Sequence, residues 1–169
     1  AHVTALATGD SWLERGATIL IFGPPGVGKS HLGTGIGHAL IEAGYRVLFM
    51  RTSEMVQRLQ AARQGLQLPA TLSKLDRFDL LILDEFQLMN EDAWGVVGAP
   101  MLLDNNGDVI IIYTPPSIRT AGMSKAKDPR HAAKLFKEWA RRQADQPERY
   151  AAFSFTSHDN PHISAEALE

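Results

Sequence analysis

A single segment, residues 19–30, restricts the possible folds of this chain more than any other. Its sequence is Ile-Leu-Ile-Phe-Gly-Pro-Pro-Gly-Val-Gly-Lys-Ser, an apolar run typical of a buried strand that leads into the pattern G-x-x-x-x-G-K-S. The residues from Lys29 to Ala43 are typical of a helix, and Gly44 is a typical stop signal. Backbone N–H groups of such a loop and of the first helical turn point at one spot and form an anion site. The order of strand, loop and helix therefore predicts an α/β fold with a phosphate-binding loop.

This loop predicts the binding of a nucleoside triphosphate, with Mg²⁺ as the expected metal ion. Lys29 is expected to reach the β- and γ-phosphates, and the Ser30 hydroxyl is expected to hold Mg²⁺. A glycine turn that binds nothing is the alternative, but strand, loop, lysine, hydroxyl and helix all agree with a nucleotide site. The residues expected to contact the nucleotide are Gly23, Pro24, Pro25, Gly26, Val27, Gly28, Lys29, Ser30 and His31.

Two carboxylates, Asp84 and Glu85, follow a second apolar run at Leu80–Leu83. Ligands of open α/β sheets bind at the carboxyl ends of the strands, so both side chains are expected beside the loop. Asp84 is expected to hold Mg²⁺ together with Ser30, and Glu85 is expected to orient and polarise the attacking water. A strand that ends in Asp-Glu is often only a solvated strand end. Its position about 55 residues after the loop favours the catalytic interpretation.

Strand-like and helix-like segments alternate along the chain, which is the pattern of a parallel sheet covered on both faces. We expect a three-layer P-loop NTPase fold of the ASCE kind, with a mainly parallel five-stranded sheet, in a single domain over residues 1–169. Thr52 and Ser53 are candidate helix N-caps. The expected strands are 18–22, 46–50, 79–85, 109–114 and 150–156, and the expected helices are 29–43, 52–64, 72–75, 91–103 and 131–142.

Three glycines, Gly33, Gly35 and Gly37, lie inside the helix that follows the loop. Each costs about 1 kcal/mol of helix stability relative to alanine. They either permit close packing of the helix on the sheet or simply weaken the helix.

A sensor for the γ-phosphate is expected at the end of the strand beside the loop strand. Thr114 stands there, and its hydroxyl can donate a hydrogen bond to a phosphate oxygen, although a threonine that merely closes a strand is an equal alternative. An arginine from a neighbouring subunit often offsets the charge of the transferring phosphoryl group. Arg119 is a candidate for this arginine finger, and so are Arg130, Arg141 and Arg142.

Composition sets further limits on the function. The formal net charge is -2, and the absence of cysteine excludes disulfides and thiolate metal sites. The longest apolar runs are far shorter than the roughly 20 residues of a membrane span, and no signal peptide is visible, so a cytoplasmic protein without membrane contact is expected. The segment Arg119–Arg149 carries nine basic and four acidic residues, which indicates either a DNA contact or a solvated helix face.

The first half of the chain resembles the IstB/DnaC-type ATPases, the helper proteins of insertion-sequence transposition and helicase loading. The matching segments are Ala7–Gly16, Gly23–Leu32, Gly44–Phe49, Gln57–Arg63 and Leu83–Glu85. This resemblance implies an AAA+-type core, ATP as the nucleotide, and action on DNA in an oligomer. The expected partners are copies of the same chain, another ATPase, a transposase or a helicase.

After Glu85 the sequence resembles the large subunit of phage terminases instead. The matching segments are Gln87–Asp92, Gly98–Gly107, Tyr113–Ser117, Asp128–Lys134 and Phe155–Ser164. This second resemblance implies that residues 86–169 form the distal half of a packaging ATPase joined at the Asp84-Glu85 strand. It also places Thr114 in the motif that couples hydrolysis to movement, and it implies that nuclease activity is absent.

Three functions remain open at this point. The first is a Mg²⁺-dependent ATPase that acts on DNA, as a transposition helper or helicase loader. The second is the ATPase fragment of a terminase without its nuclease. The third is a nucleotide-binding module that does not hydrolyse ATP. Glu85 favours an enzyme, whereas the missing Thr-Ser-Asn-type sensor of the family and the hybrid surface between subunits favour the module.

Overall fold

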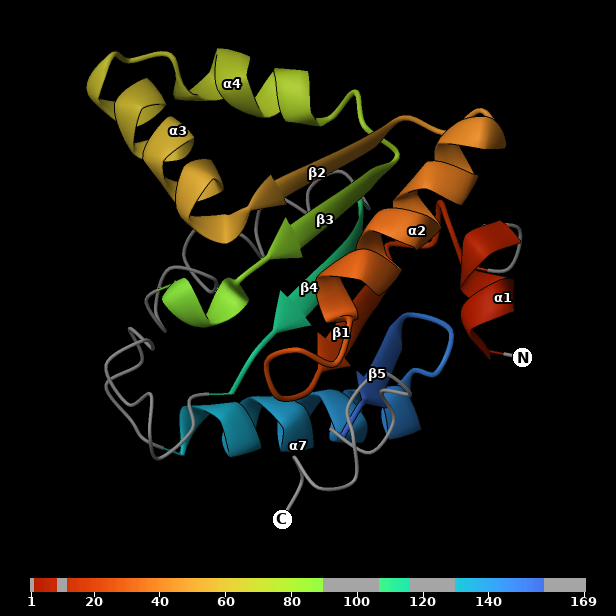
Figure 1. Cartoon of the computed structure of the whole chain (residues 1–169). Helices are drawn as coiled ribbons and strands as arrows, with labels where there is room; N and C mark the ends of the chain where they lie inside the picture. The colour runs from red at the N-terminus through yellow and green to blue at the C-terminus, as the bar shows by residue number, and fades with distance from the viewer. Residues whose placement is uncertain (1, 9–11, 90–106, 116–129, 157–169) are drawn as a thin grey trace.

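Five parallel strands form the sheet at the centre of the computed structural model (Figure 1). The structure describes residues 2–8, 12–89, 107–115 and 130–156. The strands lie in the order β2-β3-β4-β1-β5, and every neighbouring pair is parallel. The bounds are β1 Thr18–Phe22, β2 Val47–Arg51, β3 Leu80–Asp84, β4 Asp108–Tyr113 and β5 Tyr150–Ser154. The predicted parallel five-stranded sheet is therefore confirmed, with strand bounds within two residues of expectation.

Helices cover both faces of this sheet, because successive strand residues point to opposite sides. On one face, Ile19, Ile21 and Ile110 pack with α1 and α2. On the other face, Leu20 and Ile111 pack with residues of α3 and α7. The helices are α1 His2–Thr8, α2 Lys29–Glu42, α3 Thr52–Gln64, α4 Leu68–Leu75 and α7 His131–Asp145, with a 3₁₀ turn, η1, at Phe86–Leu88. The expected three layers are confirmed, and the helix expected at 91–103 lies outside the described residues.

The N-cap prediction for α3 was wrong. Arg51 caps this helix, and Thr52 is its first residue and fully buried. The Thr52 hydroxyl donates a 2.8 Å hydrogen bond to the backbone oxygen of Asp84 instead of capping the helix. The cause is the sheet register, which pairs Arg51 with Asp84 and so places the start of α3 against the end of β3.

The glycines of α2 have two different roles. A Cβ on Gly33 would lie 2.6 Å from Cδ1 of Ile112, and one on Gly37 would lie 2.9 Å from Cδ1 of Ile82. Both isoleucines are buried in the middle of the sheet, so they have little room to rotate away. A Cβ on Gly35 would meet nothing within 4 Å. Close helix–sheet packing therefore explains Gly33 and Gly37 but not Gly35.

We expect the substitutions Gly35→Ala and Gly33→Ala to change stability in opposite directions. Gly35→Ala should raise the free energy of unfolding by about 0.5–1 kcal/mol, because alanine restricts the unfolded chain and favours the helix. Gly33→Ala should lower it by about 1–3 kcal/mol, because the methyl group overpacks the core against Ile112. Urea unfolding of the two variants measures both effects. A stable Gly33→Ala variant would show that the Ile112 side chain or α2 itself can move to make room for the methyl group.

A buried carboxylate fixes the segment that leads into β1. Asp108 is 3% exposed at the start of β4, and it accepts backbone N–H groups from Glu14 at 2.5 Å and Ala17 at 2.6 Å. Burial raises the pKa of Asp108, and the hydrogen bonds from the backbone partly oppose this effect. Asp108 thereby connects two parts of the chain that are more than 90 residues apart.

Replacing Asp108 with alanine should lower the free energy of unfolding at pH 7 by about 2–3 kcal/mol, because it leaves two inward-facing N–H groups without an acceptor. The folded pKa of Asp108 is raised, so the folded state holds its proton to higher pH than the unfolded state. Its contribution to stability therefore falls as pH rises from 3.8 through the raised value. Unfolding curves between pH 4 and pH 7 measure this, and Asp108→Ala should lack that dependence. An equal loss of stability at all pH values would contradict a raised pKa for Asp108.

Candidate nucleotide-binding site

The predicted loop connects β1 to α2, and α2 begins at Lys29. Gly26 and Gly28 have φ angles of 82° and 84°, in the left-handed region that side chains disfavour. Gly28 occupies the N-cap of α2, and its carbonyl accepts the Leu32 N–H at 2.8 Å. The glycines of the pattern therefore permit the turn that aims the first amides of α2 at the loop.

Gly23 is required because the structure leaves no room for a side chain at this position. Its N–H donates to the Tyr113 carbonyl of β4 at 3.4 Å. A Cβ at this position would lie 2.6 Å from the backbone oxygen of Phe155, just beyond β5. The first residue of the loop is therefore held tightly between the ends of the two strands that flank β1.

Lys29 turns back over its own loop. Its side chain is 5% exposed, and Nζ donates a 2.6 Å hydrogen bond to the Pro24 carbonyl. Burial lowers the pKa of Lys29, and the negative charge of Asp84 opposes that shift. A buried ammonium group that is held by one loop carbonyl could turn to a phosphate anion placed on the loop.

The other residues of the loop face outward to different degrees. Pro25, Gly26, Gly28, Ser30 and His31 are exposed, whereas Pro24 and Val27 are half-buried. The loop therefore offers an open surface with Lys29 beneath it. Exposed backbone amides at a helix start, next to a buried cation, are suited to an anion.

Asp84 and Glu85 leave the sheet at the end of β3. The Asp84 carboxylate accepts the Glu85 N–H at 2.8 Å, and its backbone oxygen is held by Thr52. Glu85 has a φ of 56°, a left-handed conformation that turns the chain directly into η1. Its Oε2 lies 3.6 Å from Nε of Arg51, and the two side chains are 39% and 71% exposed. This solvent-screened ion pair is weak, so the Glu85 carboxylate can exchange it for another contact.

A metal ion bound beside the loop would have two candidate protein ligands, Ser30 and Asp84. Within the described parts of the chain, no group of three or more His, Asp or Glu side chains is arranged to hold a metal. Ser30 and Asp84 offer only oxygen donors, which is the donor type that Mg²⁺ prefers, and Mg²⁺ commonly takes one or two carboxylates together with nucleotide phosphates. The two residues fit such an ion.

Thr114 follows β4, which lies next to β1 as the sensor prediction requires. The Thr114 N–H donates to Oε1 of Gln87 at 3.1 Å. Gln87 and Arg51 were not predicted as parts of this site. Arg51 contacts Glu85 because of the β2–β3 register, and Gln87 reaches Thr114 because η1 begins immediately after Glu85. Neither contact has a signal in the sequence alone.

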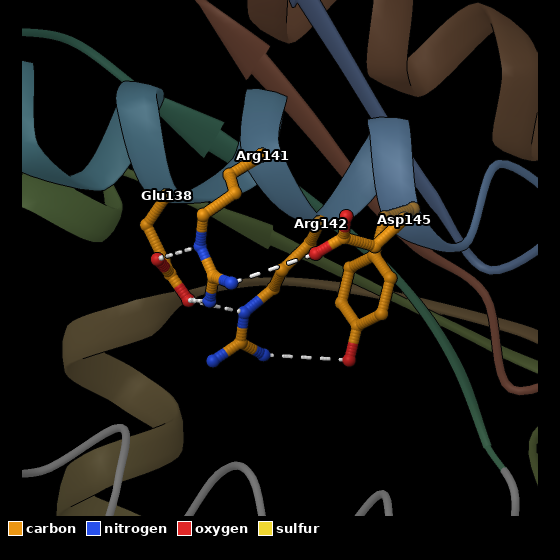
Figure 2. Close-up of polar contacts among 5 residues, drawn as sticks. Glu138, Arg141, Arg142 and Asp145 are labelled. Atoms are coloured by element: carbon orange, nitrogen blue, oxygen red, sulfur yellow. Dashed lines mark hydrogen bonds and ion pairs between the residues drawn. The ribbon is translucent and has the colours of Figure 1, made fainter.

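Two of the four candidate finger arginines are held in a network on α7 (Figure 2). Both Arg141 and Arg142 bind the Glu138 carboxylate, at 3.0 Å and 2.7 Å, and they lower its pKa to about 2. Arg142 also lies over the rings of Trp139 and Tyr150. Arg142 is thus committed to its own subunit, whereas Arg141 keeps an exposed side chain.

Of the other two candidates for the arginine finger, the structure describes Arg130 but not Arg119. Arg119 lies outside the described residues, so its assignment as a finger stays a prediction. Arg130 is exposed at the N-cap of α7. The part of the basic segment that the structure describes forms an exposed row along α7, consisting of Arg130, Lys134, Lys137 and Arg141.

The sheet order, the loop with its buried lysine, and the Asp-Glu pair together define a P-loop NTPase fold of the AAA+ type. A solved structure of the DnaC helicase loader has this fold, with a TM-score of 0.65 at 19% identity over 91% of this chain and 86% of that chain. The chain itself belongs to the IstB-like ATP-binding protein family of IS21 elements, which matches residues 1–95.

Two relatives illustrate the family. A putative insertion sequence ATP-binding protein of Sinorhizobium fredii is 61% identical over 92 residues, which is 54% of this chain and 31% of the relative. The putative ATP-binding protein of insertion sequence IS1162 from Pseudomonas fluorescens is 35% identical over 132 residues, covering 75% of this chain and 56% of the relative. The chain therefore spans only about a third to a half of the length of these relatives.

The expected joint between two families at residues 84–85 is not supported. The family match continues to residue 95. The alignment with the IS1162 relative covers 75% of the chain, so it extends well beyond residue 85. The packing agrees, because β4 is entirely buried between β3 and β1 and Asp108 binds the segment before β1. The terminase-like resemblance of residues 86–169 gains no support from these matches.

Membrane insertion was not expected from the sequence. Among the residues that the structure describes, no helix has both the length and the apolar character needed to cross a bilayer.

Proposed function

We propose that this chain is a Mg²⁺-dependent ATPase that acts on DNA as a helper of insertion-sequence transposition. The observation that carries this proposal is the loop between β1 and α2, in which the left-handed Gly26 and Gly28 place exposed backbone amides around the buried Lys29. Asp84 ends β3 at the same edge of the parallel sheet, and its negative charge opposes the lowering of the Lys29 pKa. A loop cation and a strand-end carboxylate at one edge of a sheet are the arrangement needed for a nucleotide phosphate and its metal ion.

Each residue has a distinct task in this proposal. The loop amides and Lys29 bind the β- and γ-phosphates, and Ser30 and Asp84 hold Mg²⁺, which would neutralise charge on the phosphates. Glu85 leaves Arg51 and orients the attacking water, and Thr114 donates to the γ-phosphate. An arginine from a neighbouring copy, with Arg119 as the candidate, offsets the developing charge.

The choice of transposition over helicase loading rests on the relatives. The two sequence relatives, at 61% and 35% identity, are named as insertion sequence ATP-binding proteins, whereas the likeness to the DnaC helicase loader is at 19% identity. We therefore propose a transposase as the partner. The exposed row of basic side chains on α7, Arg130, Lys134, Lys137 and Arg141, is the proposed contact for duplex DNA.

Steady-state ATP turnover tests this function. The purified chain should hydrolyse ATP in the presence of Mg²⁺ and lose turnover in EDTA. Duplex DNA should raise the rate, and the effect should decline between 50 and 200 mM salt, because phosphate contacts by basic side chains are salt-dependent. A folded protein that binds ATP without turnover, with or without DNA, would leave the non-hydrolysing module as the function.

A further inference from the structure

Gln87 connects the two halves of the candidate active site. Its Oε1 accepts the N–H of Thr114 at 3.1 Å, across 27 residues of sequence. Gln87 lies in η1, two residues after Glu85, whereas Thr114 follows the last residue of β4. The strands β3 and β4 are parallel neighbours, so both segments leave the sheet at the same edge. The contact therefore joins the end of the water-orienting strand to the sensor candidate.

The turn that carries Gln87 is firmly seated. Its neighbour Phe86 is 4% exposed, with its ring 6.4 Å from that of Tyr113, and Met89 is 7% exposed. Backbone bonds of 3.0 Å run from Leu88 to Glu85 and from Met89 to Phe86. Gln87 thus projects from a buried turn whose position relative to β4 is fixed by packing.

Thr114 itself needs such a partner. The pairing of β4 ends at Ile111 on the β3 side and at Tyr113 on the β1 side, so the Thr114 N–H lies beyond both ladders. Pro115 follows and favours an extended Thr114, which excludes a helical turn that would absorb this N–H. The Gln87 side chain supplies the acceptor in place of a further strand residue.

We propose that Gln87 is a positioning residue that sets Thr114 for recognition of the γ-phosphate. The inference rests on the proposed function, because it assigns Thr114 the role of sensor. In a catalytic site, a displacement of a positioning group by about 1 Å can lower the reaction rate about 100-fold. Gln87 holds Thr114 to the turn that follows Glu85. The Thr114 hydroxyl and the water oriented by the Glu85 carboxylate can then meet at the same γ-phosphate.

The test compares affinities for a non-hydrolysable ATP analogue, AMPPCP, and for ADP, both with Mg²⁺. In Gln87→Met, which keeps the length of the side chain but removes the acceptor, the preference for AMPPCP over ADP should fall about five- to tenfold. The affinity for ADP should stay within about twofold of wild type, because ADP has no γ-phosphate. The matched control is Gln60→Met on the exposed surface of α3, which should change neither affinity.

A double-variant cycle shows whether Gln87 acts through Thr114. Thr114→Val should lower the same preference about tenfold, and Gln87→Met combined with it should lower it no further. Additive losses, or an unchanged preference in Gln87→Met, would overturn the inference. If Gln87→Met unfolds, Gln87→Asn serves instead, because its amide is one methylene too short to reach Thr114.

This measurement separates the inference from the proposed function. Binding of AMPPCP and ADP requires no hydrolysis, so a wild-type protein without turnover would refute the ATPase and still report on Gln87. A wild-type protein with turnover but no preference for AMPPCP over ADP would overturn the role of Gln87 and leave the ATPase intact.

Discussion

Replacing Lys29 with methionine is expected to abolish nucleotide binding and, at the same time, to raise the melting temperature of the nucleotide-free protein. Lys29 is almost fully buried, burial lowers its pKa, and its Nζ donates a hydrogen bond to the Pro24 carbonyl. Methionine keeps the apolar stem and removes the desolvated ammonium. We expect a gain of about 1 kcal/mol, which is about 2–4 °C for a chain of this size.

The loss of binding should be visible in the same thermal melts. Wild-type protein with ATP and Mg²⁺ at 100 times the dissociation constant should gain about 2.7 kcal/mol, whereas Lys29→Met should gain nothing. Lys74→Met is the matched control, since Lys74 is exposed on α4 and should leave the nucleotide-induced shift unchanged. A Lys29→Met protein that ATP still stabilises would mean that the loop is not the nucleotide site.

The pH dependence of Lys29 gives a second readout. Its folded pKa lies below 10.5, so the unfolded state binds the proton more readily in the window between the lowered value and 10.5. The stability of the nucleotide-free protein should therefore rise as pH increases through that window, and Lys29→Met should lack this rise. Urea unfolding between pH 7 and pH 10 measures the difference.

Glu85→Gln is expected to reduce the turnover number for ATP about 100- to 1000-fold while changing the affinity for ATP by less than about twofold. The substitution keeps the size of the side chain and removes the carboxylate that would orient and polarise water. Affinity should survive, because Glu85 is half-exposed and its weak partner is Arg51, whereas Lys29 contacts the loop.

Single-turnover hydrolysis and binding of a fluorescent ATP analogue separate the two quantities. The matched control is Glu54→Gln, since Glu54 is an exposed carboxylate of α3 that pairs with Arg58 away from the site. Equal losses of affinity and turnover would indicate that Glu85 supports the fold of the site instead of the reaction. Unchanged turnover would remove Glu85 from the mechanism.

Local sequence patterns predicted the strand bounds well because each strand has an apolar run at its centre and a polar residue at one end. Val109 to Tyr113 is such a run, and all of β4 is buried, as expected for a central parallel strand. The loop was equally predictable, because Gly26 and Gly28 need left-handed angles that few other residues adopt. The strand bounds and the loop conformation depend on residues that are adjacent in the sequence, so one sequence is enough to predict them.

Features that depend on strand register could not be predicted. Thr52 was expected to cap α3, but the pairing of Arg51 with Asp84 turns it toward the backbone of β3. The bond from Gln87 to Thr114 likewise exists only because β3 and β4 are neighbours. The expected joint at residues 84–85 gains no support, because the family match runs past it to residue 95.

The position of β1 in the sheet has a consequence for the order in which the protein matures during synthesis. Thr18 of β1 pairs with Val109 of β4 and with Tyr150 of β5, so both neighbours of the loop strand are made long after it. Gly23 is fitted against Tyr113 and Phe155, and the loop has its final surroundings only when Phe155 has left the ribosome. Such non-local contacts form late in folding. A nascent chain that ends before β5 should therefore not retain ATP, and nucleotide capture would mark a chain in which β1 has both of its neighbouring strands.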